Sequence, residues 1–149
     1  LRAPTAPDPL CDRGRHRFTY ALLPHADDLA AVVAAGSALN APLSLRRVIG
    51  DRSGLLPARR SFVTVDDPAF VVETLKRADD GDGFIVRGYE ALGSHRTVRM
   101  SATLPFTRVT RTDLLERDHP DGGEVVLDAG GGLTLSLRPF ELVTLRLRP

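Results

Sequence analysis

The sequence is poor in the residue types on which many secreted and sugar-binding proteins depend. Its 149 residues include no tryptophan, one cysteine and only 5% aromatic residues. A disulfide needs two cysteines and a thiolate metal cluster needs several, so the lone Cys11 excludes both within this chain. We therefore expect a reducing compartment, the cytoplasm, and few aromatic platforms on which a sugar ring could stack.

Neither charge nor hydrophobicity indicates a nucleic acid or a membrane as partner. The 20 Lys and Arg residues are nearly balanced by 19 Asp and Glu residues, whereas phosphate binding needs a basic surplus on one face. The longest apolar run, LAAVVAAG at 29–36, is far shorter than the ~20 residues that cross a bilayer. It follows Asp27 and Asp28 rather than the basic start of a signal peptide. We expect neither partner.

The composition is that of a folded domain, with 42% hydrophobic and 26% charged residues. A chain of this length corresponds to about one domain. It begins with Leu1, and its single methionine is Met100, inside a strand-like run. We therefore expect it to be a piece of a longer protein, whose chemistry could lie upstream.

The first 60 residues are predicted to hold one strand and one helix in otherwise irregular backbone. Between His16 and Leu23, apolar and polar residues alternate as in a strand, which Pro24 ends. Asp27 or Asp28 can cap a short helix that runs to about Leu39. Residues 41–60 are weakly patterned and are predicted to form a long connection.

From residue 61 onward, short apolar segments alternate with turn signals, which is typical of an antiparallel β-sandwich. In the last two segments, leucine or valine alternates with threonine, serine or arginine, so each strand is predicted to have one buried and one exposed face. On this reasoning, Leu145→Asp should unfold the sandwich and Arg146→Asp should be mild. The expected strands are 61–65, 70–77, 84–90, 96–104, 108–115, 124–127, 133–138 and 141–148.

Glycine-rich segments between the strands are predicted to be turns. DDGDG at 79–83 also resembles the start of a calcium loop, but an EF-hand needs oxygen ligands at its third and fifth positions, which here are Gly81 and Gly83. Asp-Gly is a strong hairpin signal. We therefore predict a hairpin there, and further turns at PDGG (120–123) and AGGG (129–132).

We assign no catalytic residue and no metal ligand to this chain. The sequence has no HExxH, no G-x-S-x-G elbow and no phosphate-binding loop with its lysine. Scattered histidines are far more often surface residues than zinc ligands. The four here are His16, His25, His95 and His119.

Acidic residues on or beside strands are the remaining candidates, because glycoside hydrolysis needs only two carboxylates at a set separation. Most carboxylates on β-domains are solvated or paired with arginine, so pairing is the expected role. The candidates are Glu73, Glu90, Asp113, Glu116 and Glu141.

Several segments together resemble a known family. The sequence PDPLCDRGRHRFTYALLPH at 7–25, then LNAPL, FIVRGYE and the closing LRPFELVTLRL, is similar to the C-terminal β-region of glycoside hydrolase family 38, the α-mannosidases. The resemblance extends from Leu1 to Leu147. The chain departs from the family pattern at Cys11, where a small residue is common, and at Gly88, where a larger apolar residue is usual.

The resemblance implies an all-β sandwich with one short helix, in three parts. Residues 1–24 would be the terminal strand segment of a preceding large β-domain, 25–60 a helix and connecting loop, and 61–149 the C-terminal sandwich domain. A retaining α-mannosidase would carry its aspartate nucleophile and zinc in a catalytic domain outside this chain. Within the chain, Arg2, Asp8 and Asp12 are the residues expected to approach the substrate cleft.

The resemblance further implies partners and leaves two rival functions. The partners would be the catalytic domain of the same polypeptide, an α-mannoside as substrate, and further copies of the chain in a homo-oligomer. The rivals are a free-standing carbohydrate-binding sandwich and a purely structural or interaction module. The fragment alone is expected to be inactive.

Overall fold

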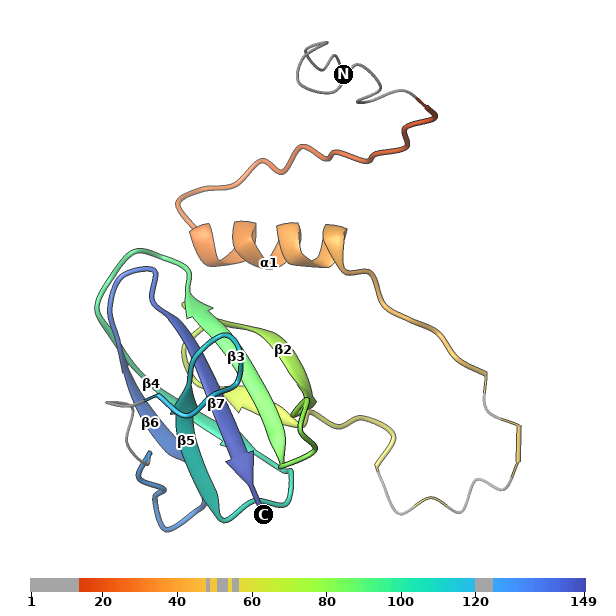
Figure 1. The fold of residues 1–149 in the computed structure, drawn as a ribbon. Helices are drawn as coiled ribbons and strands as arrows, with labels where there is room; N and C mark the ends of the chain where they lie inside the picture. Colours follow the sequence, from red (N-terminus) through yellow and green to blue (C-terminus); the bar gives the residue numbers. More distant parts are fainter. Residues whose placement is uncertain (1–13, 48, 51–53, 55–56, 120–124) are drawn as a thin grey trace.

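A computed structural model describes the chain except for residues 1–13, 48, 51–53, 55–56 and 120–124. The described residues form one short helix and two antiparallel sheets that pack face to face (Figure 1), so the predicted fold class is confirmed. The elements are α1 (Leu29–Asn40), β1 (Val63–Val65), β2 (Phe70–Arg77), β3 (Phe84–Glu90), β4 (Arg96–Ala102), β5 (Arg108–Thr112), β6 (Leu133–Leu137) and β7 (Leu142–Arg148).

The two sheets enclose a single apolar core. One sheet has the strand order β1-β4-β6 and the other the order β2-β3-β7-β5. Alternate side chains of each sheet point between the layers, as the strand period of two requires. The buried core cluster contains Phe70, Val86, Val98, Met100, Val109, Leu133, Leu135, Leu137, Val143, Leu145 and Leu147.

The predicted alternation is confirmed for β6 and wrong for β7. In β6 the three leucines are buried, whereas Thr134 and Ser136 are exposed. In β7, Thr144 and Arg146 are as buried as the leucines, with Arg146 only 4% exposed. The reason is position: β7 lies between β3 and β5, and the loop after β5 covers its outer face.

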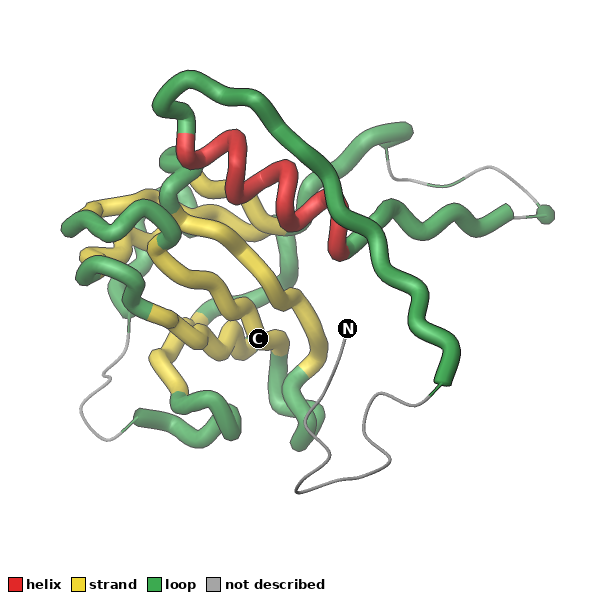
Figure 2. The backbone as a smooth tube through the Cα atoms, turned by 90° about the horizontal axis from the view of Figure 1, so that it is seen from above, coloured by secondary structure: helices red, strands yellow, loops and turns green. Residues whose placement is uncertain are grey.

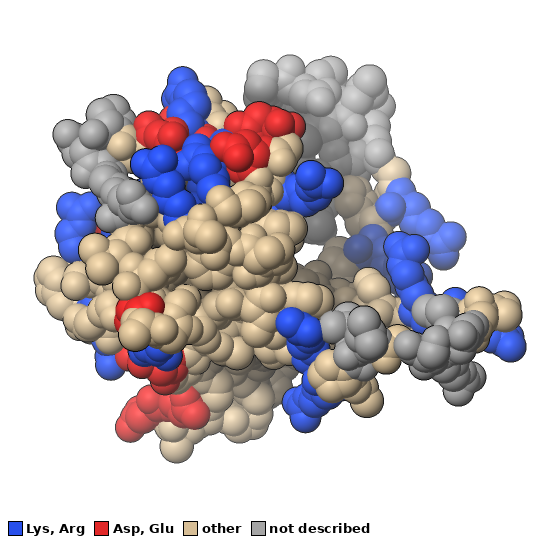
Figure 3. Space-filling model, turned by 90° about the horizontal axis from the view of Figure 1, so that it is seen from below, with Lys and Arg blue, Asp and Glu red and all other residues tan. Residues whose placement is uncertain are grey.

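A network of charged side chains holds this loop and the β2–β3 hairpin against the outer face of the sheet. The Arg146 guanidinium donates to Asp80 at 2.6 Å and to the backbone oxygen of Glu116 at 2.6 Å. Arg148 bonds Asp82 and Asp118 in the same way. Acidic and basic side chains accordingly lie side by side on the sandwich (Figure 3).

The hairpin predicted at 79–83 joins β2 to β3, with Arg77 paired to Phe84. Gly81 and Gly83 have φ of 81° and 89°, which suits glycine. A bulge at Glu73 shifts the register between Val72 and Thr74. The turn at 129–132 is also confirmed, because the Asp128 N–H donates to the Gly132 carbonyl oxygen at 2.7 Å.

Gly88 is required by packing within the four-stranded sheet. A Cβ atom there would lie 2.6 Å from the Phe70 ring and 2.6 Å from the Val71 carbonyl oxygen. The Phe70 ring therefore fills the space that a larger residue at 88 would occupy. A side chain at this position would require Phe70 or the β2 backbone to shift.

Helix α1 begins where the sequence indicates. The Asp28 carboxylate accepts a hydrogen bond from the Ala31 N–H at 2.9 Å, the geometry of an N-cap. The helix lies over β2 (Figure 2), where Val32 and Val33 are half-buried, but no helix residue is fully buried. Packing against the sandwich therefore covers only part of the helix.

Two predicted strands are absent from the described part of the chain, and others are shorter than expected. Residues 16–23 are not a strand, because no neighbouring strand supplies hydrogen bonds to them. Of 124–127, residue 124 lies outside the described residues and only Leu127 forms an isolated bridge. The strand expected at 108–115 ends at Thr112, because the Asp113 carboxylate accepts from the N–H groups of Leu115 and Arg117 and starts a turn.

The burial of Arg146 reverses one expectation from the sequence. Arg146→Asp would place a carboxylate beside Asp80 and Asp82, so we expect it to lower the free energy of unfolding by more than about 3 kcal/mol, as Leu145→Asp should. Thr134→Asp, on the exposed face of β6, is the matched control and should cost little. Thermal melts of the three variants measure this. An Arg146→Asp melt close to that of the control would contradict the assigned ion network.

Candidate functional site

The residues expected to approach the substrate cleft, Arg2, Asp8 and Asp12, lie outside the described residues, as does Cys11. Their assignment stays a prediction. The described part of the chain offers two other features with functional potential. One is a polar pocket beside β7, and the other is an extended N-terminal arm with exposed apolar side chains.

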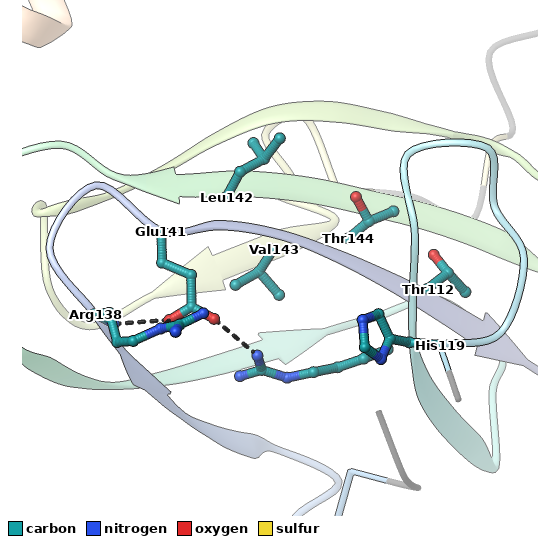
Figure 4. Close-up of a pocket in the computed structure, with 8 residues that line it drawn as sticks. Thr112, His119, Arg138, Glu141, Leu142, Val143 and Thr144 are labelled. Atoms are coloured by element: carbon teal, nitrogen blue, oxygen red, sulfur yellow. Dashed lines mark hydrogen bonds and ion pairs between the residues drawn. The ribbon is translucent and has the colours of Figure 1, made fainter. Parts of the chain in front are cut away.

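The pocket lies where β5 ends and leaves the start of β7 uncovered (Figure 4). Its volume is about 410 Å³. We call it the Glu141 pocket, because Glu141 is the acidic residue in its wall and organises the others. Its main lining residues are Arg111, Thr112, His119, Arg138, Glu141 and Leu142.

Two arginines surround the Glu141 carboxylate. Its Oε1 accepts from the Arg111 guanidinium at 3.0 Å, and its Oε2 accepts from the Arg138 backbone N–H at 2.7 Å. Burial raises the pKa of Glu141, but hydrogen bonds from Arg138 and Arg111 outweigh it, so the pKa lies below the ordinary value. Arg111 also contacts the Ser136 backbone oxygen at 3.5 Å and so links the two sheets.

The Glu141 pocket therefore contains two guanidinium groups and one carboxylate. Sequence reasoning considered Glu141 and His119 but missed Arg111 and Arg138. The spacing of Arg138 and Glu141 around Pro139 and Phe140 is a signal that could have identified the second arginine. The Thr112 hydroxyl is enclosed and has no hydrogen-bond partner among the described residues, so it forms part of the pocket wall rather than a ligand contact.

Glu90 organises two loops at one end of the sandwich. Its side chain is fully buried and accepts backbone N–H groups of Leu92, Gly93 and Ser94, and of Phe140 from the loop before β7. Burial raises the pKa of Glu90, but these four donors together lower it below the ordinary value. Phe140 is held with φ of 58°, stacked on Gly93 and 70% exposed.

Four of the five carboxylates singled out in the sequence have structural partners, whereas Glu73 is exposed at the bulge of β2. Pairing with arginine is confirmed for Asp113, which contacts Arg117, and for Glu141. Glu116 pairs with Lys76 instead. Hydrogen bonds from these partners hold the pKa values of Asp113 and Glu116 below the ordinary range. A general acid needs a raised pKa, so the four of these carboxylates whose pKa is lowered are not suited to that role.

The described residues do not fit a zinc site. No three His, Cys, Asp or Glu side chains among them are grouped closely enough to hold a metal ion. The four histidines lie on separate, exposed parts of the chain. In the same described part, no helix is long and apolar enough to span a membrane.

The N-terminal arm, residues 14–25, carries apolar side chains into solvent. Phe18, Tyr20 and Leu22 alternate with Arg17, Thr19 and Ala21, and Tyr20 and Leu22 are 84% and 93% exposed. The Phe18 and Tyr20 rings stack with their centroids 6.1 Å apart. Figure 1 shows the arm running outside the sandwich beyond α1. Such an alternating, exposed segment has the form of a strand without a sheet.

The fold is an antiparallel β-sandwich. Its two exposed features are the Glu141 pocket and the apolar side chains of the N-terminal arm. Residues 69–145 match the model of the glycosyl hydrolases family 38 C-terminal beta sandwich domain. This match covers more than half of the chain. The chain therefore belongs to that family, as its sequence motifs indicated.

Curated relatives match the chain over almost its whole length. Alpha-mannosidase 2C1 of Homo sapiens is 38% identical over 99% of this chain. Alpha-mannosidase G of Dictyostelium discoideum is 30% identical over 98%, and alpha-mannosidase of Saccharomyces cerevisiae is 27% identical over 99%. The chain spans 14–15% of the length of these relatives.

The role of Glu90 can be tested by an isosteric change. In Glu90→Gln, an amide NH₂ replaces one of two oxygens that both accept backbone N–H groups, so in either orientation a donor faces a donor, and we expect a loss of about 2–3 kcal/mol in the free energy of unfolding at pH 7. Glu73→Gln, at the exposed bulge, is the control and should change it by less than about 0.5 kcal/mol.

The same pair of variants reports on the pKa of Glu90 through denaturant unfolding at several pH values. Because the folded-state pKa is lowered, the stabilisation by Glu90 is complete above the ordinary pKa of about 4 and is lost as pH falls through the folded-state value. The difference between wild type and Glu90→Gln should therefore shrink in acid. Equal unfolding midpoints at pH 7 would refute the proposed role of Glu90.

Proposed function

We propose that this chain is the C-terminal β-sandwich region of a retaining α-mannosidase and that it braces the domains that precede it. The observation that carries the proposal is the exposed arm in a chain that spans about one seventh of its α-mannosidase relatives. The substrate would be a terminal α-mannoside. The nucleophile and zinc would lie in the preceding catalytic domain.

The arm supports a bracing role through its pattern. Phe18, Tyr20 and Leu22 occupy alternate positions, which in a strand would lie on one face. Each such side chain gains about 1.5–3 kcal/mol when fully buried. Residues 1–24 would thus complete a sheet of the preceding β-domain, while 25–60 connect it to the sandwich at 61–149. Arg2, Asp8 and Asp12 would then be carried toward the substrate cleft.

Further aspects of the proposal follow from the sequence. The lone Cys11 supports a reducing compartment, and we place the enzyme in the cytoplasm. A part in mannose metabolism would follow from α-mannoside hydrolysis. Carbohydrate contact by this chain would be limited to the cleft-facing residues, and association with further copies would use surfaces outside the cleft.

The proposed division of labour can be tested with three purified proteins, each supplied with zinc. These are the 149-residue chain, the full-length enzyme, and the full-length enzyme without this chain. We expect aryl α-mannoside hydrolysis only by the full-length enzyme, and a lower melting temperature for the shortened one. Turnover by the chain alone would overturn the architectural role. Unchanged activity and melting of the shortened enzyme would overturn the bracing role.

The arm can be tested separately. Tyr20→Ser combined with Leu22→Ser removes apolar side chains that are exposed in the chain alone. We expect the double variant to lower the melting temperature of the full-length enzyme but not that of the isolated chain. Thr19→Ser, on the opposite side of the same segment, is the control and should be neutral in both. An equal response of the two proteins would show that the arm does not pack on the preceding domains.

A further inference from the structure

We infer that the Glu141 pocket receives a carboxylate side chain, an aspartate or glutamate, from the part of the polypeptide that precedes this chain. This inference rests on the proposed function. It goes beyond it by naming a contact site and the chemistry of the group that fills it.

In the lining of the Glu141 pocket, guanidinium groups outnumber carboxylates. Both Glu141 oxygens already accept a hydrogen bond, one from Arg111 and one from the Arg138 backbone. The two guanidinium groups face a single carboxylate, which leaves one net positive charge among these three residues. An additional acceptor with negative charge would complete the arrangement.

Arg138 is the residue that can donate further hydrogen bonds. Its side chain is 79% exposed, and its ion contact with Glu141 is long, with 3.7 Å between Nε and Oε2. Within the described chain, its terminal guanidinium nitrogens have no hydrogen-bond partner. A guanidinium binds a carboxylate through two parallel hydrogen bonds, so this side chain is suited to that group.

A carboxylate fits the charged side chains of the Glu141 pocket better than a neutral sugar does. It only accepts hydrogen bonds, and it supplies the negative charge that would balance the second guanidinium.

Exposed hydrophobic residues lie in and beside the Glu141 pocket, as they do in protein–protein interfaces. Leu142 in the pocket wall is 44% exposed, and Phe140, next to Glu141 in the chain, is 70% exposed. Aromatic residues and arginine are enriched at interface centres. Because most of each relative's length lies outside the region matched by this chain, the preceding polypeptide is the partner to which we assign the carboxylate.

The contact can be captured with a zero-length carbodiimide, which joins an amine to a carboxylate in direct contact. Lys76 is the single lysine of this chain, so Arg138→Lys introduces a distinctive amine at the Glu141 pocket. Arg77→Lys, exposed at the opposite end of the four-stranded sheet, is the matched control. Both are made in the full-length enzyme, and peptides are identified by mass spectrometry.

We expect Lys at 138, but not Lys at 77, to be joined to one aspartate or glutamate of the preceding polypeptide. A link confined to Glu141, a link to a second copy of the enzyme, or no link at all would overturn the inference. If the shortened enzyme is still destabilised in those cases, the bracing role survives and only this contact is wrong.

A second measurement does not depend on crosslinking chemistry. Arg138→Ala in the full-length enzyme should lower the melting temperature by about 1–2 °C, and Arg138→Glu should lower it further by repulsion. Arg77→Ala should leave it unchanged. In the isolated chain, Arg138→Ala should have no such effect. Equal melting temperatures for the Arg138 and Arg77 variants of the full-length enzyme would contradict the inference.

Discussion

The buried guanidinium of Arg146 is the constraint on which the outer face of the four-stranded sheet depends. A charged group at 4% exposure is costly unless its hydrogen bonds are met. Asp80 from the β2–β3 hairpin and the Glu116 carbonyl from the loop after β5 accept from its two terminal nitrogens, whereas its Nε is buried without a hydrogen-bond partner among the described residues. One side chain thus fixes two segments that are distant in sequence, and the loop it holds shields β7 from solvent.

The same constraint explains where prediction from sequence succeeded and failed. The alternation of β6, the cap of α1 and the hairpin at 79–83 depend on local residue patterns, and they could be read directly. The exposed face assigned to β7 was wrong because burial there depends on a loop placed by long-range ion pairs. The strand predicted at 16–23 was wrong for a related reason, since a strand also needs a neighbour.

For the candidate site, too, the sequence predicted only part of what the structure shows. Glu141 and Glu90 stood out in the sequence as acidic residues beside strands, but their roles could not be predicted from it. Glu90 binds four backbone N–H groups from two loops, a contact set that depends on how the strand ends meet. Arg111 lies in β5 and Arg138 directly follows β6. Only the folded chain brings both arginines to the Glu141 carboxylate.

The arm lacks a sheet that would bury its apolar side chains, and the Glu141 pocket lacks an acceptor for Arg138. Phe18, Tyr20 and Leu22 have the apolar face of a strand without the sheet that would bury it. The terminal guanidinium nitrogens of Arg138 have no hydrogen-bond acceptor in the described chain, and its Nε makes only a long ion contact with Glu141. The sandwich core is complete without either, because its leucines and valines are already buried between the two sheets. Stability of the sandwich therefore does not account for these features, whereas the proposed contact with a larger polypeptide would account for both, the first by burial and the second by charge.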